Sequence, residues 1–389
     1  MPKLPQQIAD CKIAIIYDRV TTRYGGAEKV LAAIHQIFPN AVLYTSVYDS
    51  KNTEWADEIK VIPTWLQNIP FAKHHHRWLL PLLPSAFESI DLSTYNIVIS
   101  VTSAEAKGVI TLPEQLHICY LLTPTRYLYS HQQIYLQAAH HTIWKLDGIV
   151  KKIFKYIEWW DIAASARPDV YLPISKLIAH RLATHYQRKA TQVIYPPVED
   201  LPRSKKPTKT AFFDTYYLVI SRLVPYKKID LVIHATQLLG KNLIIVGDGP
   251  EKKHLQKVIE STHKPEKIKL LDPLPKADVL SLMRNATALV MPGIEDFGIT
   301  PLEALTQETP SIVHFESGVA ELLRHKKTGI HLQELTVNGL IEALEQIEST
   351  SFSTAEMKKV VTKNSTKQFK KTIQQVVTTL WKEHYVKYT

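Results

Sequence analysis

Short runs of apolar residues alternate with helical patterns along the whole chain. In the first half the runs cover 12–17, 41–45, 96–101, 117–122 and 169–173. A Gly25-Gly26 turn follows the first run and leads into an amphipathic pattern at about 27–38. Continuous apolar strands separated by helices predict a parallel sheet that is covered on both faces.

The same alternation restarts in the second half, after a stretch without periodicity at 199–210. The later apolar runs cover 216–221, 242–246, 267–271, 288–291 and 311–314. We therefore predict two doubly wound α/β domains, over residues 10–200 and 211–365, that face each other across a cleft. The helical pattern at about 366–389 must dock on one of them, and it can pack back on the N-terminal domain.

Composition and charge narrow the class of protein. With 389 residues, 45% of them hydrophobic, the chain suits two domains with a core each. Its formal net charge of +10 fits nucleic acid, anionic lipid or phosphorylated small molecules. Lysines are mixed with aromatic residues in the segment 145–160, and a second basic and apolar run covers 73–84. Such mixtures are typical of surfaces that rest on an anionic bilayer, although a solvated helix face is an equal alternative.

The cysteines and the N-terminal residues indicate the cellular compartment in which the protein is expected. Cys11 and Cys119 lie in apolar runs, so we expect buried free thiols in a reducing compartment. The first residues contain no apolar segment of the signal-peptide kind, and no apolar run is long enough to span a bilayer. These features predict a cytoplasmic protein that can contact the inner face of the cell membrane.

Several chemistries find no support in the sequence. There is no Asp-x-Asp pair, Walker A sequence or G-x-S-x-G elbow. The triple His74-His75-His76 lacks the spacing and carboxylate of a helical zinc site, so no metal site is expected. Gly247-Asp248-Gly249 is weak evidence for a dinucleotide site, because a strand-to-helix turn explains it equally well.

The segment 292–304 carries the strongest local signal. A strand ends near Met291, a glycine-containing loop follows, and a helix is predicted to begin at Thr300. Thr300 followed by Pro301 and Glu303 predicts a capping box. The amides of Gly298, Ile299 and Thr300 would also form an anion site at the start of that helix.

The segment 221–228 gives the second signal. Arg222 and Lys227 follow a strand in a tight proline-containing turn, where both can reach one diphosphate without a metal. Gly25 and Gly26, in the other predicted domain, would allow a close backbone approach to the same ligand.

Together these segments resemble glycosyltransferase family 4, a family of retaining enzymes with the two-domain GT-B fold. The resemblance extends over nearly the whole chain and is closest to mannosyltransferases of lipopolysaccharide and exopolysaccharide assembly. The motifs, in chain order, are Gly26-Ala27-Glu28, Ala106-Lys107-Gly108, Thr123 to Tyr127, Tyr195 to Val198, Ser221 to Lys227, and the E-x7-E pair Glu295 and Glu303.

The resemblance implies a role for each matching residue. Arg222 and Lys227 would hold the donor diphosphate, and Glu295 would contact the donor sugar near its anomeric carbon. Glu303 would accept hydrogen bonds from the ribose. Gly25, Gly26, Gly298, Ile299 and Thr300 would complete the phosphate cradle, and Lys107, Arg126 and Tyr127 would lie on the acceptor side. The implied reaction moves a hexose, first of all mannose from GDP-mannose, to a lipid-linked or glycan acceptor, with no cofactor and no metal.

One departure from the family pattern leaves alternatives open. Leu122 stands where the family has a histidine thought to contact the donor sugar, and leucine can neither move a proton nor hydrogen-bond a hydroxyl. A non-catalytic nucleotide-sugar-binding protein and a nucleotide-sugar epimerase of the same fold are the alternatives. Nucleic acid is not expected as a partner, because only net charge supports it.

Overall fold

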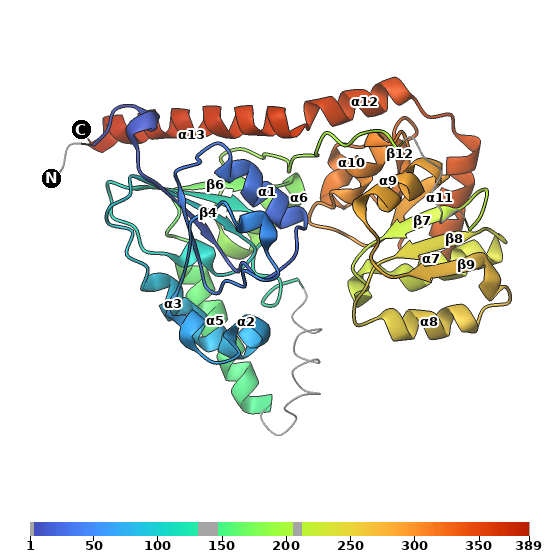
Figure 1. The fold of residues 1–389 in the computed structure, drawn as a ribbon, viewed down its shortest axis with the longest axis horizontal. Helices are drawn as coiled ribbons and strands as arrows, with labels where there is room; N and C mark the ends of the chain where they lie inside the picture. Colours follow the sequence, from blue (N-terminus) through green and yellow to red (C-terminus); the bar gives the residue numbers. More distant parts are fainter. Residues whose placement is uncertain (1–3, 131–146, 205–211, 389) are drawn as a thin grey trace. The chain divides into compact units, whose positions relative to one another are not determined.

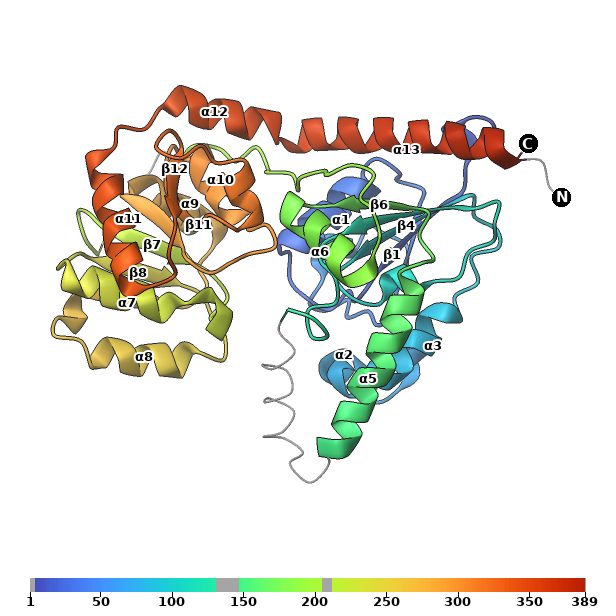
Figure 2. The same cartoon turned by 180° about the vertical axis from the view of Figure 1, so that it is seen from behind.

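The computed structural model describes residues 4–130, 147–204 and 212–388. It divides the chain into two compact units. We call Met1–Pro197 with Phe369–Thr389 the N-terminal unit, and Val198–Gln368 the C-terminal unit. Figures 1 and 2 show each unit as a twisted sheet with helices on both faces. Two doubly wound α/β units, as predicted, are confirmed.

The N-terminal unit contains a six-stranded parallel sheet in the order β3-β2-β1-β4-β5-β6. Its strands are β1 (Ile13–Tyr17), β2 (Val42–Thr45), β3 (Val61–Pro63), β4 (Ile97–Thr102), β5 (Leu116–Leu121) and β6 (Val170–Pro173). Its α-helices are α1 (Gly26–His35), α2 (Ala72–His75), α3 (Leu83–Glu88), α5 (Asp147–Ala164) and α6 (Lys176–Tyr186). Short 3₁₀ helices include η4 (His76–Leu82) and η5 (Ala106–Gly108).

The C-terminal unit repeats this topology, with the sheet order β12-β11-β10-β7-β8-β9. Its strands are β7 (Tyr217–Ile220), β8 (Leu243–Val246), β9 (Ile268–Leu271), β10 (Ala288–Met291), β11 (Ser311–His314) and β12 (Gly329–Leu332). Its helices are α7 (Ile229–Leu238), α8 (Lys252–Glu260), α9 (Lys276–Asn285), α10 (Thr300–Thr306), α11 (Val337–Ser349) and α12 (Thr354–Lys363), with 3₁₀ turns η7 (Pro225–Lys227) and η9 (Gly318–Glu321).

The ten predicted strands are all present, with ends within two residues of the expected positions. The prediction missed β3 and β12, each at one edge of its sheet, although it found β6 and β9 at the opposite edges. β3 has only three residues, none of them fully buried, and β12 contains Gly329 and His331, so neither strand is an uninterrupted apolar run. By contrast, every residue of the central strands β1, β4 and β10 is buried, as parallel strands covered on both faces require.

The C-terminal helix α13 (Thr366–Tyr388) belongs to the N-terminal unit from Phe369 onward. Phe369 packs edge-on against Tyr120 of β5, with ring centroids 5.9 Å apart. Trp381 is buried, and its indole nitrogen donates a hydrogen bond to the carbonyl of Pro5 at 3.1 Å. Helix α13 therefore closes the N-terminal unit with residues from the opposite end of the sequence (Figure 2).

The two cysteines differ in exposure, which corrects one expectation. Cys119 is buried in β5, but Cys11 is only half-buried and lies before β1 rather than inside the sheet. Burial raises the pKa of both thiols to about 12, so both are protonated at neutral pH.

A buried histidine on β5 predicts an acid-sensitive N-terminal unit. Burial, with a smaller effect from Arg167, lowers the pKa of His117 to about 3, and Ser100 Oγ lies 2.9 Å from its Nε2. Between this pKa and the ordinary value of about 6.5, the unfolded chain binds a proton that the folded chain does not. The free energy of unfolding should therefore fall by about 1.4 kcal/mol for each pH unit below about 6.5. Urea unfolding at several pH values should show this slope, and His117→Gln should flatten it. An unchanged slope in the variant would contradict the assignment.

Candidate functional site

The candidate site of the C-terminal unit lies where strands β7 and β10 pair. These two strands are neighbours at the centre of the sheet. From β7 the chain continues to β8 in one half of the sheet, and from β10 it continues to β11 in the other half, so the strand order reverses between them. In doubly wound sheets, ligands bind beyond the carboxyl ends of the strands at such a switch point. The two segments with the strongest sequence signals, 221–228 and 292–304, begin at these strand ends.

The loop after β7 is shaped by its contact with the loop after β8. The amide of Leu223 donates to the carbonyl of Asp248 at 2.9 Å. A Cβ atom on Gly247 would lie 1.9 Å from the Ser221 carbonyl oxygen, and one on Gly249 would lie 2.3 Å from that of Leu223. Both glycines are thus needed for close backbone packing, and this explains Gly247-Asp248-Gly249 without a dinucleotide site.

The loop after β10 lies equally close to the β7 loop. A Cβ atom on Gly293 would come within 2.5 Å of the Tyr226 carbonyl oxygen. Ser317, just beyond β11, donates from Oγ to the Gly293 carbonyl at 3.2 Å and accepts from the amide of Glu295 at 3.1 Å. The start of this loop is therefore held by the close contact of Gly293 with the β7 loop and by the two hydrogen bonds of Ser317.

Lys227 and Glu295 form an ion pair across the two loops. The Lys227 side chain is 16% exposed and that of Glu295 is 8% exposed, so both charges are largely removed from water. Lys227 Nζ also lies 5.5 Å from the centre of the Tyr226 ring. The structure therefore brings together two of the three residues predicted to be catalytic. A carboxylate in this position offsets the lysine charge and holds its side chain between the two loops.

Arg222 lies in the same loop and is exposed, with Nη2 donating to the hydroxyl of Tyr226 at 3.3 Å. Glu303 is half-buried in the first turn of α10. Arg222, Lys227 and Glu295 thus come from the ends of two paired strands, and Glu303 from the helix that follows one of them.

The start of α10 differs from the predicted capping box. Ile299 is the N-cap, no side chain caps the helix, and Thr300 is already helical. Gly298 adopts φ +86, a left-handed conformation that favours glycine, and this bend places the loop differently from a Thr300 cap. The structure gives no hydrogen bond from the amides of Gly298, Ile299 and Thr300 to a described residue. These amides can therefore donate hydrogen bonds to a ligand.

Gly25 and Gly26 lie at the start of α1 in the N-terminal unit, and the amide of Gly25 is already bonded. It donates to Glu28 Oε2 at 3.1 Å, while Glu28 Oε1 accepts from Tyr17 at 2.9 Å and Thr22 at 2.7 Å. A Cβ atom on Gly25 would lie 2.8 Å from this carboxylate. In this conformation Glu28 satisfies the amide of Gly25.

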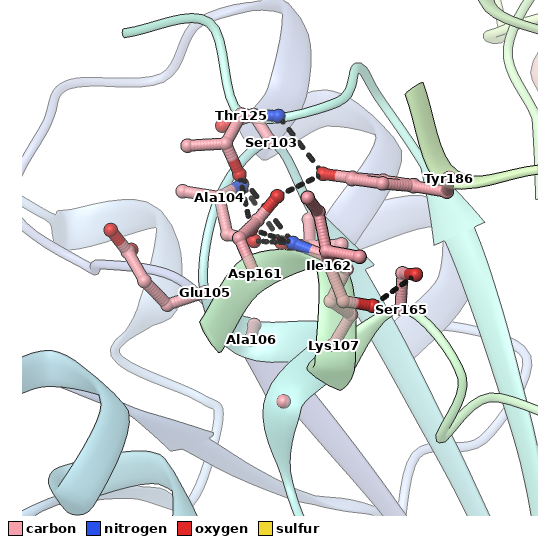
Figure 3. A network of polar contacts seen from close by, with 12 residues as sticks. Ser103, Ala104, Glu105, Ala106, Lys107, Thr125, Asp161, Ile162, Ser165 and Tyr186 are labelled. Atoms are coloured by element: carbon pink, nitrogen blue, oxygen red, sulfur yellow. Dashed lines mark hydrogen bonds and ion pairs between the residues drawn. The ribbon is translucent and has the colours of Figure 1, made fainter. Parts of the chain in front are cut away.

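The three residues expected on the acceptor side lie in different surroundings. Lys107 is fully buried, and its Nζ donates to Asp161 Oδ1 at 2.5 Å and to the Ala104 carbonyl at 2.7 Å (Figure 3). Tyr127 is buried and donates to Glu105 Oε1 at 2.5 Å. Arg126 is half-buried beside it. The buried Lys107 ammonium is held by Asp161 and cannot reach an acceptor in this conformation, which corrects that expected role.

Sequence reasoning missed a buried carboxylate at the switch point of the N-terminal sheet. Asp18 follows β1 and accepts from the Thr102 hydroxyl and the Ser103 amide at 2.7 Å each, and from the Ala106 amide at 2.8 Å. It ties the end of β1 to the loop after β4. Leu122, which follows β5, is buried and leaves its side chain in the core. Asp18 directly after an apolar strand was the available signal.

Over the described parts of the chain, no cluster of three or more His, Cys, Asp or Glu side chains is arranged to hold a metal ion. Within those parts, too, no helix has the length and apolar character needed to cross a bilayer. The side chains of His74, His75 and His76 lie outside the described set.

A family model described as "Glycosyl transferases group 1" matches residues 203–368, which is nearly the whole C-terminal unit. One curated relative is the GDP-mannose-dependent alpha-(1-6)-phosphatidylinositol monomannoside mannosyltransferase of Mycobacterium tuberculosis. It is 24% identical over 251 residues, which are 58% of this chain and 63% of that protein. The putative colanic acid biosynthesis glycosyltransferase WcaL of Escherichia coli is 24% identical over 46% of this chain and 47% of its own length. The chain thus spans less than two thirds of these relatives.

Solved structures establish the fold over nearly the whole chain. Anabaena Alr3699/HepE in complex with UDP and glucose superposes with a TM-score of 0.68 and 16% identity, covering 95% of this chain and 100% of that one. The lipopolysaccharide outer core galactosyltransferase WaaB superposes with a TM-score of 0.64 and 18% identity, covering 94% and 99%. Two parallel six-stranded sheets with this likeness make up a GT-B fold.

Proposed function

Because residues 203–368 form a glycosyl transferases group 1 domain on a GT-B fold, we propose that this chain is a glycosyltransferase that uses a nucleotide-sugar donor. The observation that carries the proposal is the buried ion pair between Lys227 and Glu295, formed at the switch point within that domain. Its position suits a donor whose diphosphate lies beside Lys227 and Arg222 and whose sugar lies beside Glu295.

The proposed reaction retains the configuration of the transferred sugar and needs no metal ion. The bond between the anomeric carbon and the donor phosphate breaks, and a bond from the acceptor oxygen to that carbon forms on the same face. The acceptor proton passes to the departing phosphate oxygen. Lys227, Arg222 and the amides of 298–300 would stabilise the negative charge that develops on the leaving diphosphate. Preorganised hydrogen-bond donors and positive charges of this kind stabilise the same negative charge that a Mg²⁺ ion stabilises in other transferases.

For the donor we propose GDP-mannose and for the acceptor a lipid-linked or polysaccharide glycan at the inner face of the cell membrane. The mannosyltransferase named in M. tuberculosis and the colanic acid relative support this choice, whereas the Anabaena structure holds UDP and makes a uridine donor the competing one. Leu122 favours one further candidate, a protein that binds the nucleotide-sugar without turnover.

A thermal-shift measurement against GDP-, UDP-, ADP- and dTDP-sugars in EDTA tests the proposal. A donor at about 100 times its dissociation constant should stabilise the protein by about 2.7 kcal/mol. We expect this shift with GDP-mannose, and Lys227→Met should reduce it. A shift with a UDP-sugar alone would correct the donor, and no shift with any nucleotide would overturn the proposed function. Turnover assays then separate the alternatives, because an epimerase would release an altered nucleotide-sugar without any acceptor.

A further inference from the structure

Helix α5 of the N-terminal unit has one face in the core and one in water. Phe154, Ile157 and Trp160 are buried, and they recur at the three-residue spacing of one helix face. The opposite face is exposed and carries basic, aromatic and aliphatic side chains. These are Lys151, Lys152, Lys155, Tyr156, Trp159 and Ile162, which we call the α5 outer face.

Trp159 is the centre of the α5 outer face. At 100° per residue, Lys155 and Ile162 lie on one side of it and Lys152 and Tyr156 on the other. The side chain of Trp159 is 71% exposed, although Trp is among the side chains that gain most from leaving water. The structure therefore leaves a large apolar ring in water, surrounded by positive charges, on a helix that the core already holds.

The charges on this helix are arranged by face. Between Lys151 and Ile162 the acidic residues are Glu158 and Asp161; Glu158 is half-buried at the edge, and Asp161 is buried in the ion pair with Lys107. The α5 outer face is therefore purely basic. Lysine is depleted in protein–protein interfaces, whereas lysines beside Trp and Tyr on one helix face are typical of helices that lie in the headgroup region of a bilayer. Trp and Tyr rings prefer that depth, with the apolar ring buried and the polar atom hydrated.

We propose that the α5 outer face binds the surface of an anionic lipid bilayer. Trp159, Tyr156 and Ile162 insert among the headgroups, and Lys151, Lys152 and Lys155 contact lipid phosphates. Binding of this kind leaves the fold unchanged, because α5 is held by its buried face. Figures 1 and 2 show α5 extending from the sheet beside α2, away from the strand ends of the N-terminal sheet.

Vesicle flotation of the full chain tests this proposal with two matched pairs of variants. The test vesicles contain phosphatidylcholine, alone or mixed with phosphatidylglycerol. Leu238→Ala is the control for Trp159→Ala, because Leu238 on α7 is also 71% exposed. Lys253→Gln/Lys257→Gln on α8 is the control for Lys152→Gln/Lys155→Gln, because these lysines are exposed on a helix that lacks aromatic residues.

We expect the wild type to float with the anionic vesicles only, and less so as salt is raised. Each lysine near the surface is worth about a five-fold change in affinity, so Lys152→Gln/Lys155→Gln should weaken binding about 25-fold. Trp159→Ala should also weaken it, while both controls bind like the wild type. No flotation, equal flotation with neutral vesicles, or equal losses in the controls would overturn the proposal. The assay contains no donor and needs no turnover, so its failure is distinguishable from failure of the proposed function.

Discussion

Lys227→Ala is expected to lower the rate of sugar transfer by about 10²- to 10³-fold, which is the cost of removing one preorganised hydrogen-bond donor from a developing negative charge. The lysine sits in the β7 loop, only partly exposed and paired with Glu295 of the β10 loop. It is therefore held in place before a ligand arrives. The rate should be measured at saturating donor, so that loss of binding is separated from loss of charge stabilisation in the transition state.

Two further variants show whether charge alone explains this loss. Lys227→Arg keeps the charge and should retain more activity than Lys227→Ala, although the guanidinium does not fit the same position. Lys253→Ala removes an exposed lysine from the same unit and should leave the rate unchanged. Glu295 lies only 8% exposed, so loss of Lys227 also leaves an uncompensated buried carboxylate. A melting curve must therefore accompany each rate. Wild-type transfer by a folded Lys227→Ala protein would remove this lysine from the site.

The core of the fold could be predicted from sequence because central parallel strands are apolar on both faces. Every residue of β1 and β10 is buried, and both appear in the sequence as uninterrupted apolar runs. β3 and β12 were missed because their apolar patterns are short or interrupted: all three residues of β3 are half-buried, and β12 includes the half-buried His331. Edge position alone was not the cause, because β6 also lies at an edge, is fully buried and was predicted.

Position in the fold was enough to bring the two predicted segments together. Arg222 and Lys227 lie in the loop after β7 and Glu295 in the loop after β10, and these strands pair in parallel, so their carboxyl ends lie at the same edge of the sheet. What a polar side chain bonds to was not predictable. The Gly25 amide meets Glu28, and Lys107 meets Asp161, 54 residues away in sequence. A motif records that a lysine is present, and three-dimensional packing decides whether it faces a ligand or the core.

Lys107→Met should lower the free energy of unfolding of the N-terminal unit by about 3–5 kcal/mol, as removal of one partner from a buried ion pair does. Both side chains of the Lys107–Asp161 pair are 1% exposed. Burial alone would lower the pKa of Lys107, but the Asp161 carboxylate outweighs this effect and raises it, so Lys107 carries its charge at neutral pH. Urea unfolding followed by circular dichroism measures the loss.

The partners of Asp161 determine which second variant is informative. Its Oδ1 accepts from Thr125 at 2.8 Å, and its Oδ2 accepts from Tyr186 at 2.7 Å (Figure 3). Its Oδ2 also accepts from Tyr129 at 3.0 Å. Lys107→Met/Asp161→Asn removes both charges and keeps an oxygen acceptor, so it should cost less than Lys107→Met alone.

Lys252→Met provides the exposed comparison for this prediction, because the ion pair of Lys252 with Asp272 has side chains 38% and 74% exposed. A pair in water should contribute about 1 kcal/mol or less. If Lys107→Met cost no more than Lys252→Met, the buried pair would not hold α5 to the loop after β4. A large loss, partly restored in the double variant, would mean that this lysine of the motif maintains the N-terminal unit.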